Sequence, residues 1–307
     1  MCCRIPPGCH GSADSSDRDS RAGSGGSSPA KIGRVQLVRL VPILLYVTTL
    51  SWYIAVILCG LSIGSFLNVV IHRLPRKIKF RTGRSNCPRC NEQLKWYHNI
   101  PVVSYLFLRG RCAFCGERIS LRYPIVELSN MAAYLYFFWQ FGATLNFFVF
   151  AFLSSALIAI FLIDLDFQII PDLISLPGIV VGFAVSFLPG GIGPVSSLVG
   201  LLVGGGALYA VALLGDWLFK KESMGGGDIK MAAMLGAFLG WQKVLFIFIA
   251  SAAIGLVVSV VLMAFSQKLR QHRVIPFGPF LAMAALLAIV YGDQLIGLYV
   301  RYFIPTQ

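Results

Sequence analysis

The feature that most constrains this chain is a series of apolar runs, each close to the length of a membrane-spanning helix. They fall at residues 40–71, 124–141, 144–163, 170–189, 195–219, 229–241, 243–266 and 275–300. A helix needs about 20 mainly apolar residues to cross a bilayer. Only 13% of the residues are charged, against about 25% in soluble domains. The sequence therefore predicts an all-α polytopic membrane protein with about eight transmembrane helices.

The amino-terminal residues 1–36 differ from the rest of the chain. They are rich in Ser, Gly and Asp, and they offer little apolar surface to bury. Such a composition is typical of a disordered tail, so the first transmembrane helix is expected at residues 37–71. The formal net charge of +13 would suggest a nucleic-acid partner in a soluble protein. In a membrane protein Lys and Arg report orientation instead, and no nucleic-acid partner is predicted.

The loop after the first apolar run, residues 72–123, is strongly basic. Its two acids are Glu92 and Glu117, and its basic residues are Arg73, Arg76, Lys77, Lys79, Arg81, Arg84, Arg89, Lys95, Arg109, Arg111, Arg118 and Arg122. Basic loops remain on the cytoplasmic side. Counting spans from this loop puts the turns near 164–172, 220–228 and 267–274 on the same side. The basic residues of the tail point the other way, but the larger loop outweighs them.

The same loop holds four cysteines in two Cys-x-x-Cys pairs, Cys87 with Cys90 and Cys112 with Cys115. Each pair can supply two thiolates from one turn, and two pairs complete a tetrahedral zinc site. Disulfides are rare in the cytoplasm, so the alternatives are free thiols or a redox pair. A site closed by four cysteines is structural. We therefore predict that residues 72–123 form a cytoplasmic zinc-binding domain.

Two acids lie at the ends of apolar runs on the predicted cytoplasmic side. Asp164 ends one run, and Asp228 follows the glycines of "GGGD" at the start of another. Acids at such a depth are costly and call for a function. If the two meet, they can activate a water as an aspartic protease does. Composition and topology equally allow a proton relay for transport or a purely structural pair.

Two nearby acids and two glycine pairs have simpler interpretations. Asp172 follows Pro171, where it is expected to cap the start of a helix, and Asp166 is expected to be a solvated turn residue. Two Gly-x-x-x-Gly pairs, Gly60 with Gly64 and Gly200 with Gly204, are expected to let helices pack closely.

Four motifs in order resemble the bacterial type IV prepilin peptidase family. They are "GSFLNVVIHRLP" (64–75), the two Cys-x-x-Cys pairs with "NIPVVSYLFLRGRC" (99–112) and "ISLRYPIVE" (119–127), "DLDFQIIPD" (164–172) and "GGGDIK" (225–230). The resemblance covers about residues 60–300. It departs from the family in the long polar tail and in Gly226, which fills a position where a larger apolar residue is common.

The resemblance implies a membrane aspartic peptidase at residues 124–303, with Asp164 and Asp228 as the catalytic pair. Its substrates would be prepilins and the pseudopilins of type II secretion, cleaved at the cytoplasmic face of the bacterial inner membrane. Many members also methylate the new amino terminus with S-adenosylmethionine, an activity linked to the cysteine loop. Gly110 and Arg111 are then the candidate cofactor residues. The alternative function is a proton-coupled transporter or a non-enzymatic zinc-bearing membrane scaffold.

Overall fold

The computed structural model of the chain describes residues 29–78, 86–87, 89–220, 224–265 and 276–303. Within these ranges the regular structure is helical, apart from two isolated antiparallel bridges in the loop after the first helix. The all-α prediction is therefore confirmed. The chain divides into two units, Met1–Leu50 and Ser51–Gln307.

Helix α1 begins earlier than expected. It spans Pro29–Arg73, so residues 29–36 are helical and do not belong to a disordered tail. Proline suits the first turn of a helix, where its missing N–H would have no partner. The part of the predicted tail at residues 1–28 lies outside the described residues.

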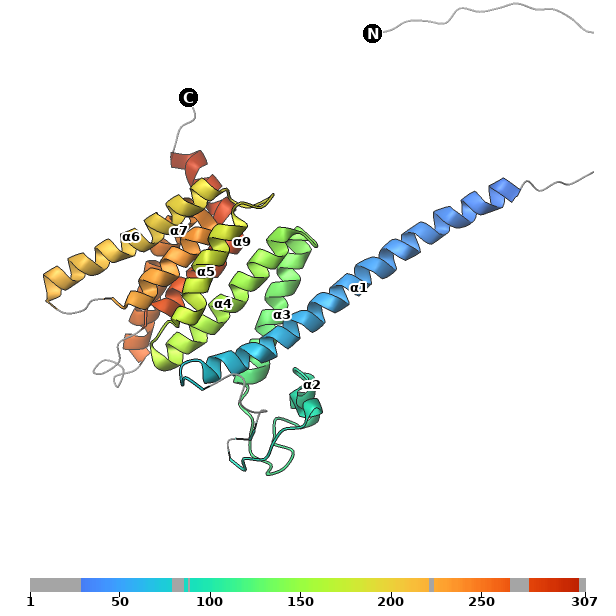
Figure 1. The fold of residues 1–307 in the computed structure, drawn as a ribbon, viewed down its shortest axis with the longest axis horizontal. Helices are drawn as coiled ribbons and strands as arrows, with labels where there is room; N and C mark the ends of the chain where they lie inside the picture. Colours follow the sequence, from blue (N-terminus) through green and yellow to red (C-terminus); the bar gives the residue numbers. More distant parts are fainter. Residues whose placement is uncertain (1–28, 79–85, 88, 221–223, 266–275, 304–307) are drawn as a thin grey trace, which may run out of the picture. The chain divides into compact units, whose positions relative to one another are not determined.

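The second unit is a bundle of helices. After α1 these are α3 (Arg122–Phe141), α4 (Leu145–Phe167), α5 (Asp172–Val185), α6 (Pro194–Phe219), α7 (Gly226–Phe265) and α9 (Gly278–Phe303). In this arrangement α7 contacts α5, α6 and α9, while α4 contacts α3, α5 and α9 (Figure 1). Fully buried side chains of α4, α7 and α9, such as Leu157, Met234 and Leu281, form the core between them. The bundle thus brings the end of α4 near the starts of α7 and α9.

Helix α7 consists of two segments that meet at Gly240, whose backbone is not helical (φ 80°, ψ 169°). A Cβ at Gly204 of α6 would lie 3.0 Å from the Ala232 carbonyl carbon and 3.4 Å from a Val244 methyl. In a straight helix these two residues would stand about 18 Å apart. The chain therefore reverses direction at Gly240, which agrees with two apolar runs at 229–241 and 243–266.

Each of the eight predicted apolar runs coincides with a helical segment in the described part of the chain. By length and composition alone, five helices could cross a membrane: Val47–Arg73, Leu145–Phe167, Pro194–Phe219, Gly226–Leu262 and Gly278–Leu298. Helix α3 is not among these five, and α5, with 14 residues, is also too short to be counted. The multi-pass architecture follows from the five long helices.

The glycine pairs act as expected. A Cβ at Gly60 of α1 would lie 2.8 Å from the Cα atom of a residue of α3, and a Cβ at Gly64 would lie 2.7 Å from another. In the same way Gly200 of α6 packs directly on Gly236 and Gly240 of α7. Side chains at these positions would force the helices apart, because the facing atoms are backbone.

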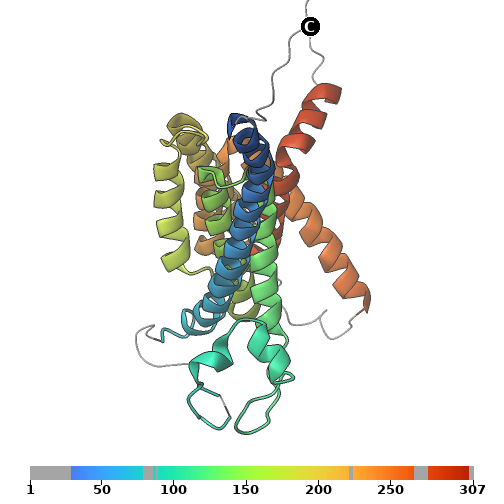
Figure 2. The ribbon, with the colours of Figure 1, turned by 90° about the vertical axis from the view of Figure 1, so that its right-hand side faces the viewer.

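The segment between α1 and α3 forms a small cysteine-rich domain at one end of the bundle (Figure 2). It contains a 3₁₀ turn, η1 (Trp96–Asn99), and a short helix, α2 (Val103–Phe107). The buried carboxylate of Glu127, on α3, accepts a hydrogen bond of 2.8 Å from the backbone N–H of Val102. This bond ties the start of α2 to the bundle. The basic residues Lys79, Arg81 and Arg84 lie outside the described residues.

Candidate functional site

Asp164 lies in the last turn of α4, and its side chain is buried (4% exposed). The helix ends at Gln168, which adopts a left-handed conformation (φ 55°) and donates its N–H to the Asp164 carbonyl over 2.9 Å. Buried carboxylates normally carry a partner, yet no ion pair among the described residues includes Asp164. Asp164 is thus buried without an ion-pair partner in the described part of the chain.

Asp228 lies in the first turn of α7 and is half-buried. Its Oδ1 atom is fully covered and has no hydrogen-bond partner in the described part of the chain. A Cβ at Gly227, next to Asp228, would lie 2.9 Å from the Ile170 Cβ, and one at Gly278, which touches Asp164, would lie 3.1 Å from Ile170 Cδ1. Both acids therefore lie around Ile170, although they are separated by 64 positions in the sequence. The sequence prediction that they can meet is consistent with this arrangement.

Gly278, at the start of α9, completes the surroundings of Asp164. A Cβ at this position would overlap Oδ2 of Asp164, so only glycine lets the α9 backbone approach the carboxylate so closely. The sequence interpretation missed this residue. Its signal was the stretch "PFGPF" at residues 276–280, where a glycine lies between two prolines at the start of an apolar run.

The three glycines before Asp228 have different surroundings. A Cβ at Gly227 would lie 2.9 Å from the Ile170 Cβ, whereas nothing lies within 4 Å of one at Gly226. A Cβ at Gly225 would be 3.6 Å from Asp228 Oδ2, which is ordinary contact. Only Gly227 is therefore required for packing, against the loop that follows α4. Of the other two, Gly226 faces open space, and Gly225 is in contact with the Asp228 carboxylate.

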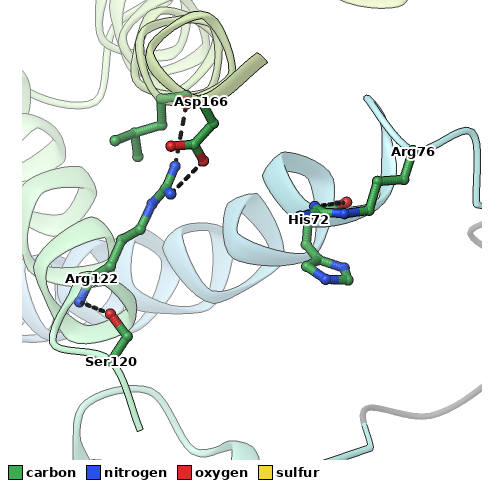
Figure 3. Close-up of polar contacts among 6 residues, drawn as sticks. His72, Arg76, Ser120, Arg122 and Asp166 are labelled. Atoms are coloured by element: carbon green, nitrogen blue, oxygen red, sulfur yellow. Dashed lines mark hydrogen bonds and ion pairs between the residues drawn. The ribbon is translucent and has the colours of Figure 1, made fainter. Parts of the chain in front are cut away.

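An ion pair connects the cysteine-rich end of the bundle with the aspartates. Arg122, the first residue of α3, contacts Asp166 and donates a second bond of 3.2 Å to the Leu162 carbonyl on α4 (Figure 3). Asp166 is exposed as predicted but carries this partner. The start of α3 and the end of α4 therefore lie side by side, and Asp164 shares its end of the bundle with the cysteines.

Asp172 does not cap α5 as predicted. Pro171 holds the capping position, and no side-chain capping bond is formed. The Asp172 carboxylate instead accepts two bonds from Lys230 Nζ, of 2.7 and 2.9 Å. Lys230 stands two residues after Asp228, so the pair ties the start of α7 to the start of α5. The Asp172 carboxylate therefore pairs with a lysine of another helix and does not form the hydrogen bond to the backbone that a capping aspartate would make.

The Lys230–Asp172 pair is expected to stabilise the protein only slightly, because both side chains are about half exposed (41% and 55%). Exposed pairs contribute roughly 0–1 kcal/mol. In a double-mutant cycle with Lys230→Gln and Asp172→Asn, thermal unfolding in detergent should give a coupling energy below about 1 kcal/mol. A coupling several times larger would show that the pair is shielded from water.

The four cysteines come together in two turns of the same form. In the first, the Cys87 carbonyl accepts a bond from Asn91 (2.9 Å), and the Cys87 N–H donates to Glu92 (3.0 Å). In the second, Cys112 makes the equivalent bonds with Gly116 (3.0 Å) and Glu117 (2.8 Å). Asn91 (φ 55°) and Gly116 (φ 70°) occupy matching left-handed positions, which asparagine and glycine tolerate best.

The geometry of the cysteines fits a metal ion. Their four Sγ atoms all lie within 4.8 Å of one another. A tetrahedral zinc site with Zn–S bonds of about 2.3 Å separates its sulfurs by about 3.8 Å, and Cys87 Sγ lies 3.8 Å from Cys115 Sγ. The four residues found by spacing therefore lie close enough together to hold one zinc ion.

The thiols differ in their affinity for protons. Backbone N–H groups of Cys90 and Arg89 lower the pKa of Cys87 to about 6, which favours the thiolate that binds metal. The Glu117 N–H acts in the same direction on Cys115, but desolvation and the neighbouring thiols outweigh it and raise that pKa to about 11. The first thiolate thus forms easily, and further negative charge beside it is unfavourable until a cation is present.

Gly110 and Arg111 line an open cavity of about 580 Å³ at the second cysteine turn. Gly110 is buried and has a left-handed backbone (φ 67°). A Cβ there would lie 2.7 Å from the hydroxyl and 2.9 Å from the adjoining ring carbon of Tyr105. The two residues predicted from the resemblance thus belong to one cavity, and its size falls within the range of small-ligand sites.

These features define a class of protein: a polytopic helical membrane protein with two acids and a four-cysteine loop at the same end of its bundle. Residues 58–141 match the family described as "Bacterial Peptidase A24 N-terminal domain", and residues 151–260 match the "Type IV leader peptidase family". The chain belongs to the type IV prepilin leader peptidase/N-methyltransferase family. It is therefore an enzyme of an aspartic peptidase family and a multi-pass membrane protein.

Curated relatives support this assignment over most of their length. The chain is 35% identical to the "Prepilin leader peptidase/N-methyltransferase" of Stutzerimonas stutzeri over 280 residues, which is 82% of this chain and 95% of the relative. The protein of the same name from Pseudomonas aeruginosa is 35% identical over 85% of this chain and 99% of its own length. For Pseudomonas putida the identity is 36%, over 77% and 89%. No solved structure is significantly similar to the chain.

Proposed function

We propose that the protein cleaves basic leader peptides from type IV prepilins and from the pseudopilins of type II secretion. Cleavage would occur at the cytoplasmic face of the bacterial inner membrane, using a water molecule activated by Asp164 and Asp228. The protein then methylates the new amino terminus. The observation that carries the proposal is the convergence of two acids, one buried and one with a covered oxygen that has no hydrogen-bond partner. Neither acid belongs to an ion pair among the described residues.

The chemistry follows from two carboxyl groups that share one proton. The ionised group takes a proton from water, whose oxygen attacks the scissile carbonyl, while the protonated group donates its proton to the carbonyl oxygen. The tetrahedral intermediate then collapses, the C–N bond breaks and the leaving amine takes up a proton. No covalent bond to the enzyme forms, so inhibitors of serine and cysteine proteases should have no effect.

Two features support the proposed site of cleavage. The acids share their end of the bundle with the basic cysteine loop, which the positive-inside rule assigns to the cytoplasm. Open space at Gly226 leaves room for a substrate backbone near Asp228. A substrate helix can lie in the bilayer against the bundle while its leader remains on the cytoplasmic side.

The test is a reaction of the purified protein with a full-length prepilin, followed by mass spectrometry. Hydrolysis predicts loss of the leader mass, and methyl transfer predicts a further gain of one methyl group that requires S-adenosylmethionine. If the prepilin stays intact after incubation with the native protein in lipid, the proposed peptidase activity is contradicted. Cleavage without the added methyl group would contradict only the second activity.

Gly278→Ala is expected to slow cleavage strongly, because its Cβ would displace the Asp164 carboxylate. A shift of about 1 Å in a reacting group can reduce the rate roughly 100-fold. The matched control is Gly206→Ala in α6, where a Cβ meets no atom within 4 Å and cleavage should stay within about twofold. Initial rates at equal amounts of inserted protein measure both, and equal rates would contradict the proposed contact.

The cysteine loop would hold one structural zinc ion through Cys87, Cys90, Cys112 and Cys115. S-adenosylmethionine would supply the methyl group when bound, and its candidate contacts are Gly110 and Arg111 in the cavity beside the second turn. The fit of the four thiols to a tetrahedral ion supports the zinc site. The volume of the cavity supports a ligand of this size.

A further inference from the structure

The two cysteine turns share their backbone but differ in the residue pair that closes each of them. Asn86 is bridged to Gln93 in the first turn, and Arg111 is bridged to Arg118 in the second. In each pair, one residue stands just before the first cysteine of the turn, and the other stands three residues after the second cysteine. The same fold is therefore closed by two neutral amides in one case and by two cations in the other.

The two arginines lie directly opposite each other. Cys112 donates its N–H to Glu117, and Ile119 donates to Gly110, so the bonds flank the Arg111–Arg118 pair. In such a non-hydrogen-bonded pair the side chains of an antiparallel bridge are at their closest, with Cα atoms about 4.5 Å apart. Like charges placed opposite each other are destabilising. The neutral pair of the first turn shows that the fold itself does not need them.

No acid balances these two charges in the described part of the chain. The acid nearest in sequence, Glu117, pairs with Arg89 of the other turn, and none of the four ion pairs found there includes Arg111 or Arg118. Both arginines line the cavity beside Tyr105, together with Arg109. Three arginines that line one open cavity create a field that favours an anionic ligand group.

We propose that Arg111 and Arg118 form an oxyanion clamp, which binds the carboxylate or phosphate of a ligand in this cavity. Guanidinium groups bind planar oxygen pairs through two parallel hydrogen bonds, so two of them facing one cavity suit this chemistry. The group has two possible sources: the carboxylate of S-adenosylmethionine or the phosphate of an anionic phospholipid headgroup. The first source rests on the methyl transfer proposed above, and the second does not.

The experiment uses the full chain in nanodiscs and the variant Arg118→Gln, with Lys95→Gln as the matched control. Lys95 is an exposed cation of the same domain that does not line the cavity. In the first arm, discs of phosphatidylcholine alone are titrated with S-adenosylhomocysteine and with its decarboxylated analogue. In the second arm, thermal stability is compared between phosphatidylcholine discs and discs that also contain phosphatidylglycerol.

One arm should respond to Arg118. If the carboxylate is the ligand, the native chain binds S-adenosylhomocysteine about 10- to 100-fold more tightly than the analogue, and Arg118→Gln removes most of this difference. If the phosphate is the ligand, phosphatidylglycerol raises the melting temperature of the native chain and of Lys95→Gln but not of Arg118→Gln. Either result supports the clamp and identifies its source.

The clamp is overturned if Arg118→Gln behaves like the native chain in both arms, or if Lys95→Gln loses as much as Arg118→Gln. The result is separable from the proposed function. If the native chain binds S-adenosylhomocysteine and its decarboxylated analogue equally well, the methyl-transfer proposal stands and the clamp for this ligand is wrong. If the native chain binds neither compound but is stabilised by phosphatidylglycerol, the proposed methyl donor is wrong and the clamp stands.

Discussion

Asp164→Asn and Asp228→Asn should each reduce prepilin cleavage by at least about 10³-fold, because each removes one of the two groups that move protons in the reaction. Asparagine has nearly the same shape as aspartate, so the packing around the buried Asp164 and the covered oxygen of Asp228 should be retained. Initial rates of leader release, measured with equal amounts of membrane-inserted protein, test the prediction.

The matched control for these variants is Asp166→Asn. Asp166 lies two residues after Asp164 on the same helix, but it is exposed and pairs with Arg122. Its replacement should change cleavage by no more than a few-fold, since exposed ion pairs contribute little. Substantial cleavage by Asp164→Asn or Asp228→Asn would rule out the two-aspartate mechanism. A loss in Asp166→Asn as deep as theirs would show that the assay reports folding and not chemistry.

Cys87→Ser should abolish zinc binding and unfold the cysteine-rich domain. The purified native chain is expected to contain about one zinc per molecule, which four thiolates hold in a closed site. Binding of a structural zinc contributes about 10–16 kcal/mol in isolated zinc-finger peptides, so its loss should leave this small domain without a stable fold. Elemental analysis measures the metal, and limited proteolysis between α1 and α3 measures the unfolding.

Cys59→Ser provides the control for the metal site. Cys59 is an exposed free cysteine of α1 and does not belong to the cluster, so this variant should keep both its zinc and its resistance to protease. A chelator should reproduce the effect of Cys87→Ser on the native chain. Native protein that contains no metal after purification without chelator, or Cys87→Ser protein that keeps it, would contradict the zinc site.

Much of the architecture could be predicted because hydrophobic runs and charges act locally. The length of each apolar run fixes a helix, and all eight runs coincide with helical segments. The spacing of the cysteines was equally informative, because the two Cys-x-x-Cys turns bring their thiols together through short-range backbone bonds. Helix ends were less predictable: α1 begins at Pro29, before the apolar run that predicts it.

Contacts between distant segments could not be predicted in the same way. The partner of Asp172 is Lys230 and that of Asp166 is Arg122, and each pair joins two different helices. The role of Gly278 depends on the position of its backbone against Asp164, which no local pattern encodes. The reversal of α7 at Gly240 likewise brings Ala232 and Val244 to the same position on α6.

The sequence by itself determined that this is a helical membrane protein, which residues supply its thiols, and which acids lie at the ends of its apolar runs. These properties follow from composition, spacing and hydrophobic length, which act over a few turns of chain. Only the tertiary structure decided which charges are paired and which are left free. Within the described ranges, Asp164 and Asp228 form no ion pair with a cation, and Arg111 and Arg118 form none with an acid. The physical reason is that neutralisation of a charge depends on the groups that packing brings near it.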